Sequence, residues 1–298
     1  MSAPSSLRAS VVLVGYNSAE FIDRCLDSLL AQDIPPGDYE IVLIDNASSD
    51  RTVQIAEGYR NRFLHLTVLR NDRNLGFPAA VNQATMHSQG PVLVLLNPDT
   101  TVEPSWLREL LRPFEQDPRV AVAGSRVLNG DGPGLYAAAL EILYGGVCVV
   151  HEGDRRTDAV SGCALAVRAD VFRQLGGLAT DLFMYGEDLD LGHRVRAAGY
   201  RIAYAPASVV HHSAIRRSRA STRTYMFYMA RNRTLVCVKN YRWKRLYLLA
   251  DVFVLFPLTS LTEFLRSRRK RESLRWLFEA RVDSLRESLR FLRSARRA

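Results

Sequence analysis

The chain has 298 residues, of which 47% are apolar and 24% are charged, with 18 Gly and 12 Pro. This composition excludes a fibrous or largely disordered chain, and the length is sufficient for a buried core. The net charge of +9 is unevenly distributed, because residues 211–298 carry 22 basic and 6 acidic side chains whereas residues 1–210 carry 18 and 25. An acidic body joined to a basic region favours a phosphate-bearing partner for that region, on a membrane or on nucleic acid.

The four cysteines are far apart and form no CxxC pair, which favours a reducing compartment over a zinc site or a disulfide framework. The N-terminal apolar run, Val11 to Val14, is too short for the core of a signal peptide. We therefore expect the protein to be made and kept in the cytoplasm.

Apolar, β-branched runs alternate with segments of helical periodicity over the first half of the chain. Strands are predicted in "SVVLVGYN", "YEIVLID", "LHLTVLR", "PVLVLLN" and "VAVAG", and helices in "SAEFIDRCLDSLLAQ", "RTVQIAEGYR", "PAAVNQATMHS" and "EPSWLRELLRPF". This alternation is typical of parallel βαβ units in an α/β, doubly wound sheet. Residues 125–160 are rich in glycine and predict loops and short strands, after which a strand, a short helix, a further helix and the strand "RIAYAP" follow.

Ligands of such sheets bind beyond the carboxyl ends of the strands. Four polar, turn-forming loops follow predicted strands here, at 15–17, 45–50, 71–77 and 97–100. In them, Asp99 could hold a hard divalent cation that bridges two phosphates, or could cap a helix beginning near Glu103. Asp45 could accept hydrogen bonds from a nucleobase or ribose, with capping again as the alternative. Gly76 would let the backbone approach a ligand ahead of a helix N-terminus, or could serve a simple turn.

An acidic cluster lies in "LFMYGEDLDLGHRVRAAGY". Gly186 is the expected entry to a helix, whose dipole favours carboxylates in the first turn. We expect Asp190 to pair with Arg194 on the exposed helix surface. The adjacent Glu187 and Asp188 raise each other's pKa and suit a general base.

The pair His211 and His212 follows the last predicted strand and could complete a metal shell beside Asp99 or contact phosphate, although a structural role is the alternative. Of the two we prefer His212.

These residues, in this order, resemble family 2 inverting glycosyltransferases of the GT-A fold, especially bacterial rhamnosyltransferase-like members that build cell-surface polysaccharides. The strings that carry the resemblance are "VVLVGYN", "DNASSDRT", "RNLGFPAAVN", "LLNPDT", "SGCALAVRADVF", "GG", "FMYGEDLDLGHRVRAAGYRIAYAP", "HH" and "RNRTLVCVKN". The resemblance implies a GT-A domain over 1–210, Rossmann-like with a mostly parallel central sheet flanked by helices, and a basic, partly amphipathic helical region over 211–298.

It also implies the site. Asp188 would be the general base with Glu187 beside it, and Asp99 would bind Mg²⁺ or Mn²⁺ on the donor diphosphate with His212 near the metal. The residues implied in binding the nucleotide-sugar donor are Tyr16, Asn17, Asp45, Asn74, Gly76, Asn82 and Asn97, and His211 and Gly162 are additional candidates.

The sequence departs from the family pattern at three places. Asn97 opens the metal motif where the family has Asp, so a single carboxylate would hold the cation. Gly15 stands where Thr or Ser is common, and Leu178, Ala179 and Thr180 replace the usual Phe-Asp-Glu.

The basic region contains two apolar segments. Residues 246–261, "LYLLADVFVLFPLTSL", contain Asp251 and Pro257 and fall short of the ~20 residues of a spanning helix, so we expect them to lie in or against a membrane. Further on, one predicted helical stripe lies opposite a basic face of Arg275, Arg286, Arg290 and Arg293, and the stripe comprises Leu274, Phe278, Val282, Leu285, Leu289 and Leu292. Such a helix fits an anionic lipid surface, with packing on its own domain as the alternative. Nucleic acid is not favoured, because no binding motif or interleaved aromatic platform accompanies the charge.

The sequence thus predicts a metal-dependent, hexosyltransferase-type enzyme, cytoplasmic and peripheral on the inner face of the cell membrane. Its donor would be a dTDP- or UDP-sugar, with rhamnose suggested by the subgroup, and its acceptor a glycan or lipid-linked glycan. The alternative is a non-catalytic nucleotide-sugar or membrane-binding module with the same fold.

Overall fold

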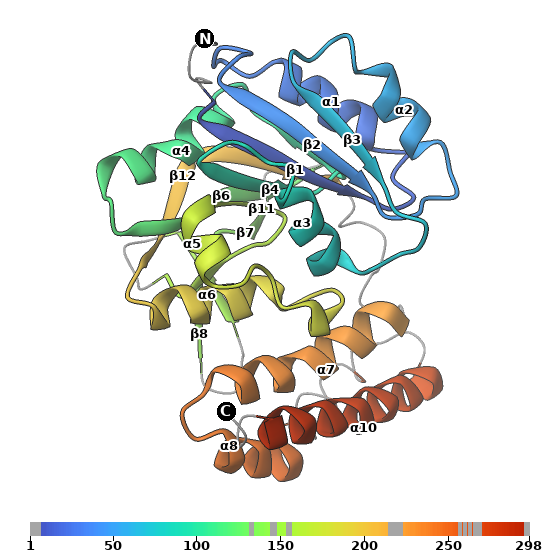
Figure 1. Cartoon of the computed structure of the whole chain (residues 1–298). Coiled ribbons are helices and arrows are strands. Elements are labelled where there is room, and N and C mark those ends of the chain that lie inside the picture. Colours follow the sequence, from blue (N-terminus) through green and yellow to red (C-terminus); the bar gives the residue numbers. More distant parts are fainter. Residues whose placement is uncertain are drawn as a thin grey trace.

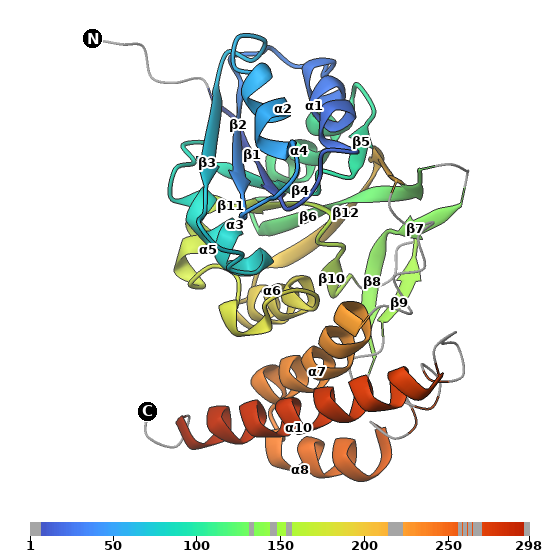
Figure 2. The ribbon, with the colours of Figure 1, turned by 90° about the vertical axis from the view of Figure 1, so that its right-hand side faces the viewer.

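The computed structural model describes residues 7–130, 134–143, 148–152, 157–213, 223–255 and 270–294, together with positions 258, 261 and 264. Its body is a nine-stranded sheet with the order β3-β2-β1-β4-β11-β6-β12-β5, in which β7 also pairs with β6 (Figure 1). Below this body in Figures 1 and 2 lies a layer of C-terminal helices.

The first half of the sheet is the parallel unit that the sequence predicts. Its strands are β1 (Ala9–Gly15), β2 (Tyr39–Asp45), β3 (Leu66–Arg70) and β4 (Val92–Leu96). The helices between them are α1 (Ile22–Leu30), α2 (Thr52–Gly58) and α3 (Phe77–Thr85). All pairings within this unit are parallel, so its carboxyl-end loops lie along one edge of the sheet.

The second half is mixed in direction. Its elements are β5 (Thr100–Val102), α4 (Trp106–Gln116), β6 (Val120–Asn129), β11 (Ala164–Arg168), α5 (Ala169–Gln174), η1 (Thr180–Leu182), α6 (Glu187–Ala197) and β12 (Arg201–His212). Strand β11 runs antiparallel to both β4 and β6, whereas β6 and β12 are parallel. Six of the nine strands therefore share one direction, and the mostly parallel sheet predicted from the sequence is confirmed.

The sheet is covered on both faces. Alternate residues of β1 enter two separate cores. Val11 and Leu13 belong to a core that includes apolar residues of α1, α2 and α4, whereas Val12 and Val14 belong to one that includes residues of α3, α5 and α6. Burial on both faces explains why these strands have continuous apolar sequences.

The glycine-rich stretch contributes short strands, as expected. They are β7 (Leu135–Ala137), β8 (Ala139–Ile142), β9 (Cys148–His151) and β10 (Ala159–Val160). The last three form a small separate sheet that lies between the body and the C-terminal helices (Figure 2).

The C-terminal layer consists of α7 (Arg223–Asn240), α8 (Lys244–Ala250), the π-helix η4 (Asp251–Leu255) and α10 (Lys270–Ser294). Both views place α7 next to the body, with α8 and α10 on its far side. Asp251 is fully buried and holds the layer together, because it accepts hydrogen bonds from Arg233 (3.0 Å), Arg281 (2.7 Å) and Thr234 (2.8 Å).

The predicted apolar stripe of α10 is mostly exposed. The helix packs on its neighbours through a different face of small residues and one leucine, namely Ser273, Leu277, Ala280, Ser284 and Ser288. Leu274, Phe278, Val282 and Leu289 are 42–70% exposed, whereas Leu285 and Leu292 pack against α7 and α8. The helix therefore packs on the protein's own domain, as in the predicted alternative, but mainly through a face other than the predicted stripe.

The segment 246–261 has a similar character. Leu246, Leu249 and Phe253 are 62%, 57% and 75% exposed, while Asp251 turns inward. Pro257 lies outside the described residues. Among the helices that the structure describes, none has the length and apolar character that crossing a membrane requires.

Candidate functional site

Four loops at the carboxyl edge of β1 to β4 form one end of the site. The buried Asn46 links two of them. Its Nδ2 donates to Asn74 Oδ1 (2.9 Å), and its Oδ1 accepts from Asn71 Nδ2 (3.1 Å) and from the N–H of Leu75 (3.1 Å). Sequence reasoning missed Asn46, since a single Asn after a strand is indistinguishable from an ordinary turn residue.

Asp45 ends β2 with a buried carboxylate. Its Oδ2 accepts the N–H of Ser48 at 3.0 Å, whereas Oδ1 is buried and has no hydrogen-bond partner among the described residues. Because helix α2 begins at Thr52, Asp45 closes a local turn and does not cap a helix. An unsatisfied buried carboxylate oxygen is an acceptor available to a ligand's N–H or O–H group.

The loop after β1 is hydrogen-bonded to the loop after β2. The N–H of Asn17 donates to Ser48 Oγ (2.9 Å), and Asn17 Oδ1 accepts the N–H of Ser49 (2.9 Å). Tyr16 beside it is 51% exposed. A Cβ on Gly15 would lie 3.0 Å from Thr52 Cγ2, so a side chain there requires Thr52 to shift, which accounts for glycine at this position.

The loop after β3 leads into α3 through Gly76, whose φ of 84° favours glycine. Asn74 Oδ1 accepts the N–H of Gly76 at 2.9 Å. Further along α3, the amide of Asn82 makes two bonds of 2.8 Å with the backbone of Leu178. Asn82 thus braces the turn after α5, where the sequence departs from the family pattern.

Asp99 follows β4 and lies beside His212. Helix α4 begins at Trp106 with Ser105 at its N-cap, so the alternative that Asp99 caps this helix is wrong. The Oδ1 of Asp99 lies 3.5 Å from the Nε2 of His212, and His212 is buried and stacks on Tyr136. His211 points elsewhere and bonds Glu103 Oε1 at 2.8 Å. The structure therefore brings His212, and not His211, next to Asp99.

These two groups suit a cation in part. The described residues contain no group of three or more His, Cys, Asp or Glu that could hold a metal ion. Mg²⁺ and similar ions at phosphate-transfer sites, however, use one or two protein carboxylates plus substrate phosphates and water. A single carboxylate with a neighbouring imidazole fits that arrangement.

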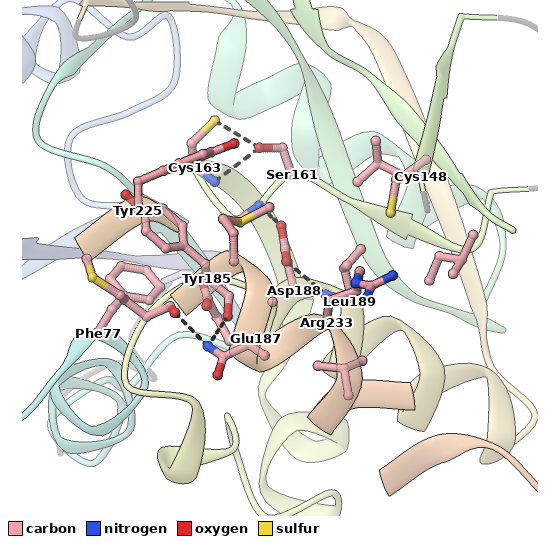
Figure 3. Close-up of a pocket in the computed structure, with 18 of the residues that line it drawn as sticks. Phe77, Cys148, Ser161, Cys163, Tyr185, Glu187, Asp188, Leu189, Tyr225 and Arg233 are labelled. Atoms are coloured by element: carbon pink, nitrogen blue, oxygen red, sulfur yellow. Dashed lines mark hydrogen bonds between the residues drawn. The ribbon is translucent and has the colours of Figure 1, made fainter. Parts of the chain in front are cut away.

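A cavity of about 580 Å³ extends from this end of the sheet to α7 (Figure 3). Asn97 and His212 line it on the sheet side, and Glu187, Asp188 and Gly162 line it further in. Its other walls are largely apolar or aromatic, and include Leu140, Ile142, Met184, Tyr185, Tyr225, Met229 and Val236.

Glu187 and Asp188 begin α6 immediately after Gly186, as predicted. Asp188 Oδ2 accepts the N–H of Gly162 at 3.0 Å, and Oδ1 accepts that of Leu189 at 2.9 Å (Figure 3). Glu187 is 9% exposed, and its Oε2 is buried with no hydrogen-bond partner among the described residues.

The two carboxyl groups titrate as a coupled pair. Burial raises the pKa of Glu187, and the negative charge of Asp188 raises it further. Burial also raises the pKa of Asp188, while the N–H groups of Gly162 and Leu189 act in the opposite direction. A carboxylate with a raised pKa is a stronger base than an exposed one, which suits it to remove a proton near neutral pH.

The neighbouring Asp190 requires a correction. It pairs with Arg194 at 2.7 Å as expected, but it is fully buried and lies on no exposed helix surface. Asn240 of α7 donates a second hydrogen bond to it at 2.9 Å. Asp190 therefore joins α6 to the C-terminal helices.

Comparison with known proteins finds two relatives that are named as glycosyltransferases. An N-acetylglucosaminyl-diphospho-decaprenol L-rhamnosyltransferase of Mycobacterium tuberculosis is 30% identical over 240 residues, covering 68% of this chain and 76% of that protein. The glycosyltransferase AglE of Haloferax volcanii is 27% identical over 208 residues, covering 66% of this chain and 64% of its own length.

Among solved structures, the mannosyltransferase PcManGT of Pyrobaculum calidifontis, in complex with GDP-Man and Mn²⁺, matches with a TM-score of 0.63 and 19% identity, covering 95% of this chain and 89% of that one. This likeness concerns the fold, and it confirms the GT-A fold expected from the sequence. The family model described as glycosyl transferase family 2 matches residues 10–176, which is more than half of the chain. Because the family model covers more than half of the chain and the mycobacterial relative is 30% identical, the chain belongs to glycosyl transferase family 2.

Proposed function

We propose that the protein transfers a sugar from a nucleotide-diphosphate donor to an acceptor hydroxyl, with inversion at the anomeric carbon. The observation that carries this proposal is a cavity whose lining includes Asn97 and His212, at the carboxyl edge of the sheet, as well as Glu187 and Asp188. A donor held at the sheet edge and an acceptor held near α6 would meet inside it.

In this proposal the donor lies along the loops after β1 to β4. Asp45 Oδ1 accepts a hydrogen bond from the base or ribose, and Tyr16 and Asn17 flank that group. Gly76 and Asn74 shape the backbone that faces the donor, while Asn82 acts through the turn at Leu178. The support is the buried Oδ1 of Asp45, which has no hydrogen-bond partner among the described residues.

Asp99 and His212 would hold Mg²⁺ or Mn²⁺, with Asn97 beside them. When bound there, the cation would supply positive charge to stabilise the departing nucleotide diphosphate. Asp99→Ala removes the only carboxylate of this pair, so we expect metal-dependent donor binding to weaken markedly.

Asp188 would be the general base. An acceptor hydroxyl has too high a pKa to attack unaided, so a carboxylate takes its proton as the new bond forms. The N–H groups of Gly162 and Leu189 fix the carboxylate plane of Asp188. Attack from the face opposite the leaving nucleotide inverts the anomeric centre.

The finer substrate assignment is rhamnose transfer to a lipid-linked glycan, in cell-surface glycan synthesis. Its support is the name of the mycobacterial relative and the apolar and aromatic lining of the inner cavity. Such a lining would accommodate the sugar faces and the lipid-proximal part of an acceptor.

The test is calorimetric titration of the protein with UDP-, dTDP- and GDP-sugars, with Mn²⁺ and then with EDTA. We expect one donor to bind tightly, and only with metal. If no donor binds to the folded protein, the enzyme proposal is wrong and the non-catalytic module remains.

We also propose that α8, η4 and α10 lie on an anionic membrane surface. We call the exposed side chains concerned the C-terminal apolar surface, and they are Leu246, Leu249, Phe253, Leu274, Phe278, Val282 and Leu289. Arg281 donates to Asp251 at 2.7 Å and lies one helical turn from Phe278, so η4 runs beside the stripe of α10.

Charge supports a lipid occupant. Arg275, Arg286, Arg290 and Arg293 are exposed, and the helical period places them along one side of the stripe and not opposite it as predicted. Arg275 and Arg290 also pair with Glu279 (2.9 Å) and Glu287 (2.6 Å) of the same helix. Basic groups beside inserted apolar groups suit anionic headgroups.

The test is sedimentation with phosphatidylglycerol and with phosphatidylcholine vesicles. Burying Phe278 contributes roughly 1.5–3 kcal/mol, so Phe278→Ser would weaken binding roughly 10- to 100-fold. Leu64→Ser is the matched control, because Leu64 is 67% exposed on the body and Phe278 is 70% exposed. No binding to anionic vesicles, or equal loss in both variants, would contradict the proposal.

A further inference from the structure

The loop that precedes the carboxylate pair has an unusual backbone. Phe183 has φ 59° and ψ −51°, and Tyr185 has φ 66°. Non-glycine residues, bulky ones above all, rarely adopt positive φ, so contacts outside the loop must hold this conformation. Because Gly186 follows directly and Glu187 begins α6, the path of the loop sets where Asp188 points.

Asn232 of α7 supplies the main polar contacts. Its side chain is buried, with 1% exposed, and its Nδ2 lies 2.7 Å from the carbonyl oxygen of Leu182, 2.8 Å from that of Met184 and 2.8 Å from that of Tyr185. One side-chain amide group thus lies within hydrogen-bond distance of three backbone carbonyl oxygens from four successive residues. The site is buried, where a carbonyl oxygen without a hydrogen bond reduces the stability of the fold.

Arg231 orients that amide. Its Nη1 donates to Asn232 Oδ1 at 2.6 Å and to the carbonyl oxygen of Asp181 at 2.9 Å. Since Oδ1 is engaged as an acceptor, Nδ2 must face the loop. The Nε of Arg231 pairs with Asp283 of α10 at 2.5 Å, so both α7 and α10 contribute to holding the loop.

Aromatic contacts add to this hold. Phe183 stacks on Tyr228 with ring centroids 5.2 Å apart, and Tyr185 meets Tyr225 edge-on at 5.6 Å. Both partners belong to α7, so the same helix supports the backbone and the side chains of the loop.

We propose that Asn232, oriented by Arg231, is a positioning residue that holds residues 182–186 in the one conformation that aims Asp188 into the cavity. This inference rests on the proposed function, because it assumes that Asp188 is the base. It gives the C-terminal helices a direct part in turnover, apart from any contact with lipid.

The test compares three variants of the full chain with wild type. Asn232→Asp keeps the shape but replaces the donor with an oxygen facing three carbonyls, and Arg231→Lys keeps the charge but loses the planar fork. Arg223→Gln is the control, because Arg223 pairs with Glu279 (3.0 Å) across the same two helices without touching the loop. The readouts are the kcat of donor hydrolysis across pH, the Kd of the donor, and hydrogen–deuterium exchange of peptides covering 182–190.

We expect Asn232→Asp to lower kcat about 100-fold, as a misplacement near 1 Å does, while the donor Kd changes less than about twofold. Its hydrogen–deuterium exchange should rise in the loop, because the carbonyl groups of Leu182, Met184 and Tyr185 lose the N–H donor of Asn232. Arg231→Lys should change in the same direction by less, and Arg223→Gln should match wild type.

The inference is wrong if folded Asn232→Asp keeps wild-type kcat and exchange, or if Arg223→Gln shows the same losses. Should Asn232→Asp not fold, Arg231→Lys decides by the same criteria. A wild-type protein without turnover on any donor would refute the proposed function, and loop exchange, which needs no substrate, would then decide this inference by itself.

Discussion

Replacing Asp188 by Asn should separate chemistry from donor binding. The two side chains have the same shape, and the cavity around position 188 keeps its volume. The Asn side chain can retain one of the two hydrogen bonds that Asp188 accepts, from Gly162 at 3.0 Å or from Leu189 at 2.9 Å. The donor loops after β1 to β4 do not include this residue, so donor binding should remain within about twofold.

The expected loss follows from the role of the group. A positioned general base contributes about 10²- to 10⁴-fold to a rate, which is about 2.7–5.4 kcal/mol at 1.36 kcal/mol per factor of ten. Release of nucleotide from the donor, with water as acceptor, measures this turnover without an identified acceptor. Calorimetry with metal present measures binding by the same protein.

Asp99→Ala is the matched comparison, because it should weaken metal-dependent binding before chemistry begins. If Asp188→Asn retains turnover within tenfold of wild type, the base is another group. If both variants lose donor binding equally, the division of roles between them is wrong.

The raised pKa values of Glu187 and Asp188 predict that kcat falls with decreasing pH in a range above the pKa of ordinary carboxyl groups. Glu187→Gln should move this fall in kcat to lower pH, because it removes a like charge beside Asp188. A fall in kcat near pH 4 in the wild-type protein would contradict the prediction. The same raised pKa means that the native state binds a proton more tightly than the unfolded state, so stability should decline as pH rises through the raised value, and thermal melts between pH 5 and 9 should show a smaller decline for Glu187→Gln. Gly124→Ala should destabilise the fold by about 1–3 kcal/mol in urea melts, because its Cβ would lie 2.2 Å from Val160 Cβ, whereas Gly58→Ala, with nothing within 4 Å, should be neutral or stabilising by about 0.4–1 kcal/mol. Equal stability of the two glycine variants would refute the packing argument.

Local sequence patterns were sufficient for the first half of the fold. The run Tyr39–Asp45 is a strand with the predicted bounds, because continuous apolar sequence and a polar turn leave few alternatives. The antiparallel direction of β11 could not be predicted, since the irregular stretch before it does not indicate from which side the chain re-enters the sheet. Strand β5 has only three residues, which is too few to show the apolar pattern by which a strand is predicted from sequence.

The candidate site divides in the same way. The position of Asp188 at the start of α6 followed from Gly186 and the acidic turn. The burial of Asp190 could not be predicted, because the helix that covers it carries Asn240, which is 50 residues further along the sequence. Asn232 was missed for that reason as well, since its three partners become neighbours only when α7 folds against the loop.

The contact between Gly76 and Phe183 limits how this enzyme can be redesigned. The N–H of Phe77 donates to the carbonyl oxygen of Phe183 at 2.7 Å, and a Cβ on Gly76 would lie 2.6 Å from that same oxygen. The turn that opens α3 and the loop that leads into α6 are therefore fitted to each other, although more than 100 residues separate them. A chimera that takes a new nucleotide pocket from a relative should exchange both segments together, because either one alone would meet a partner of the wrong shape.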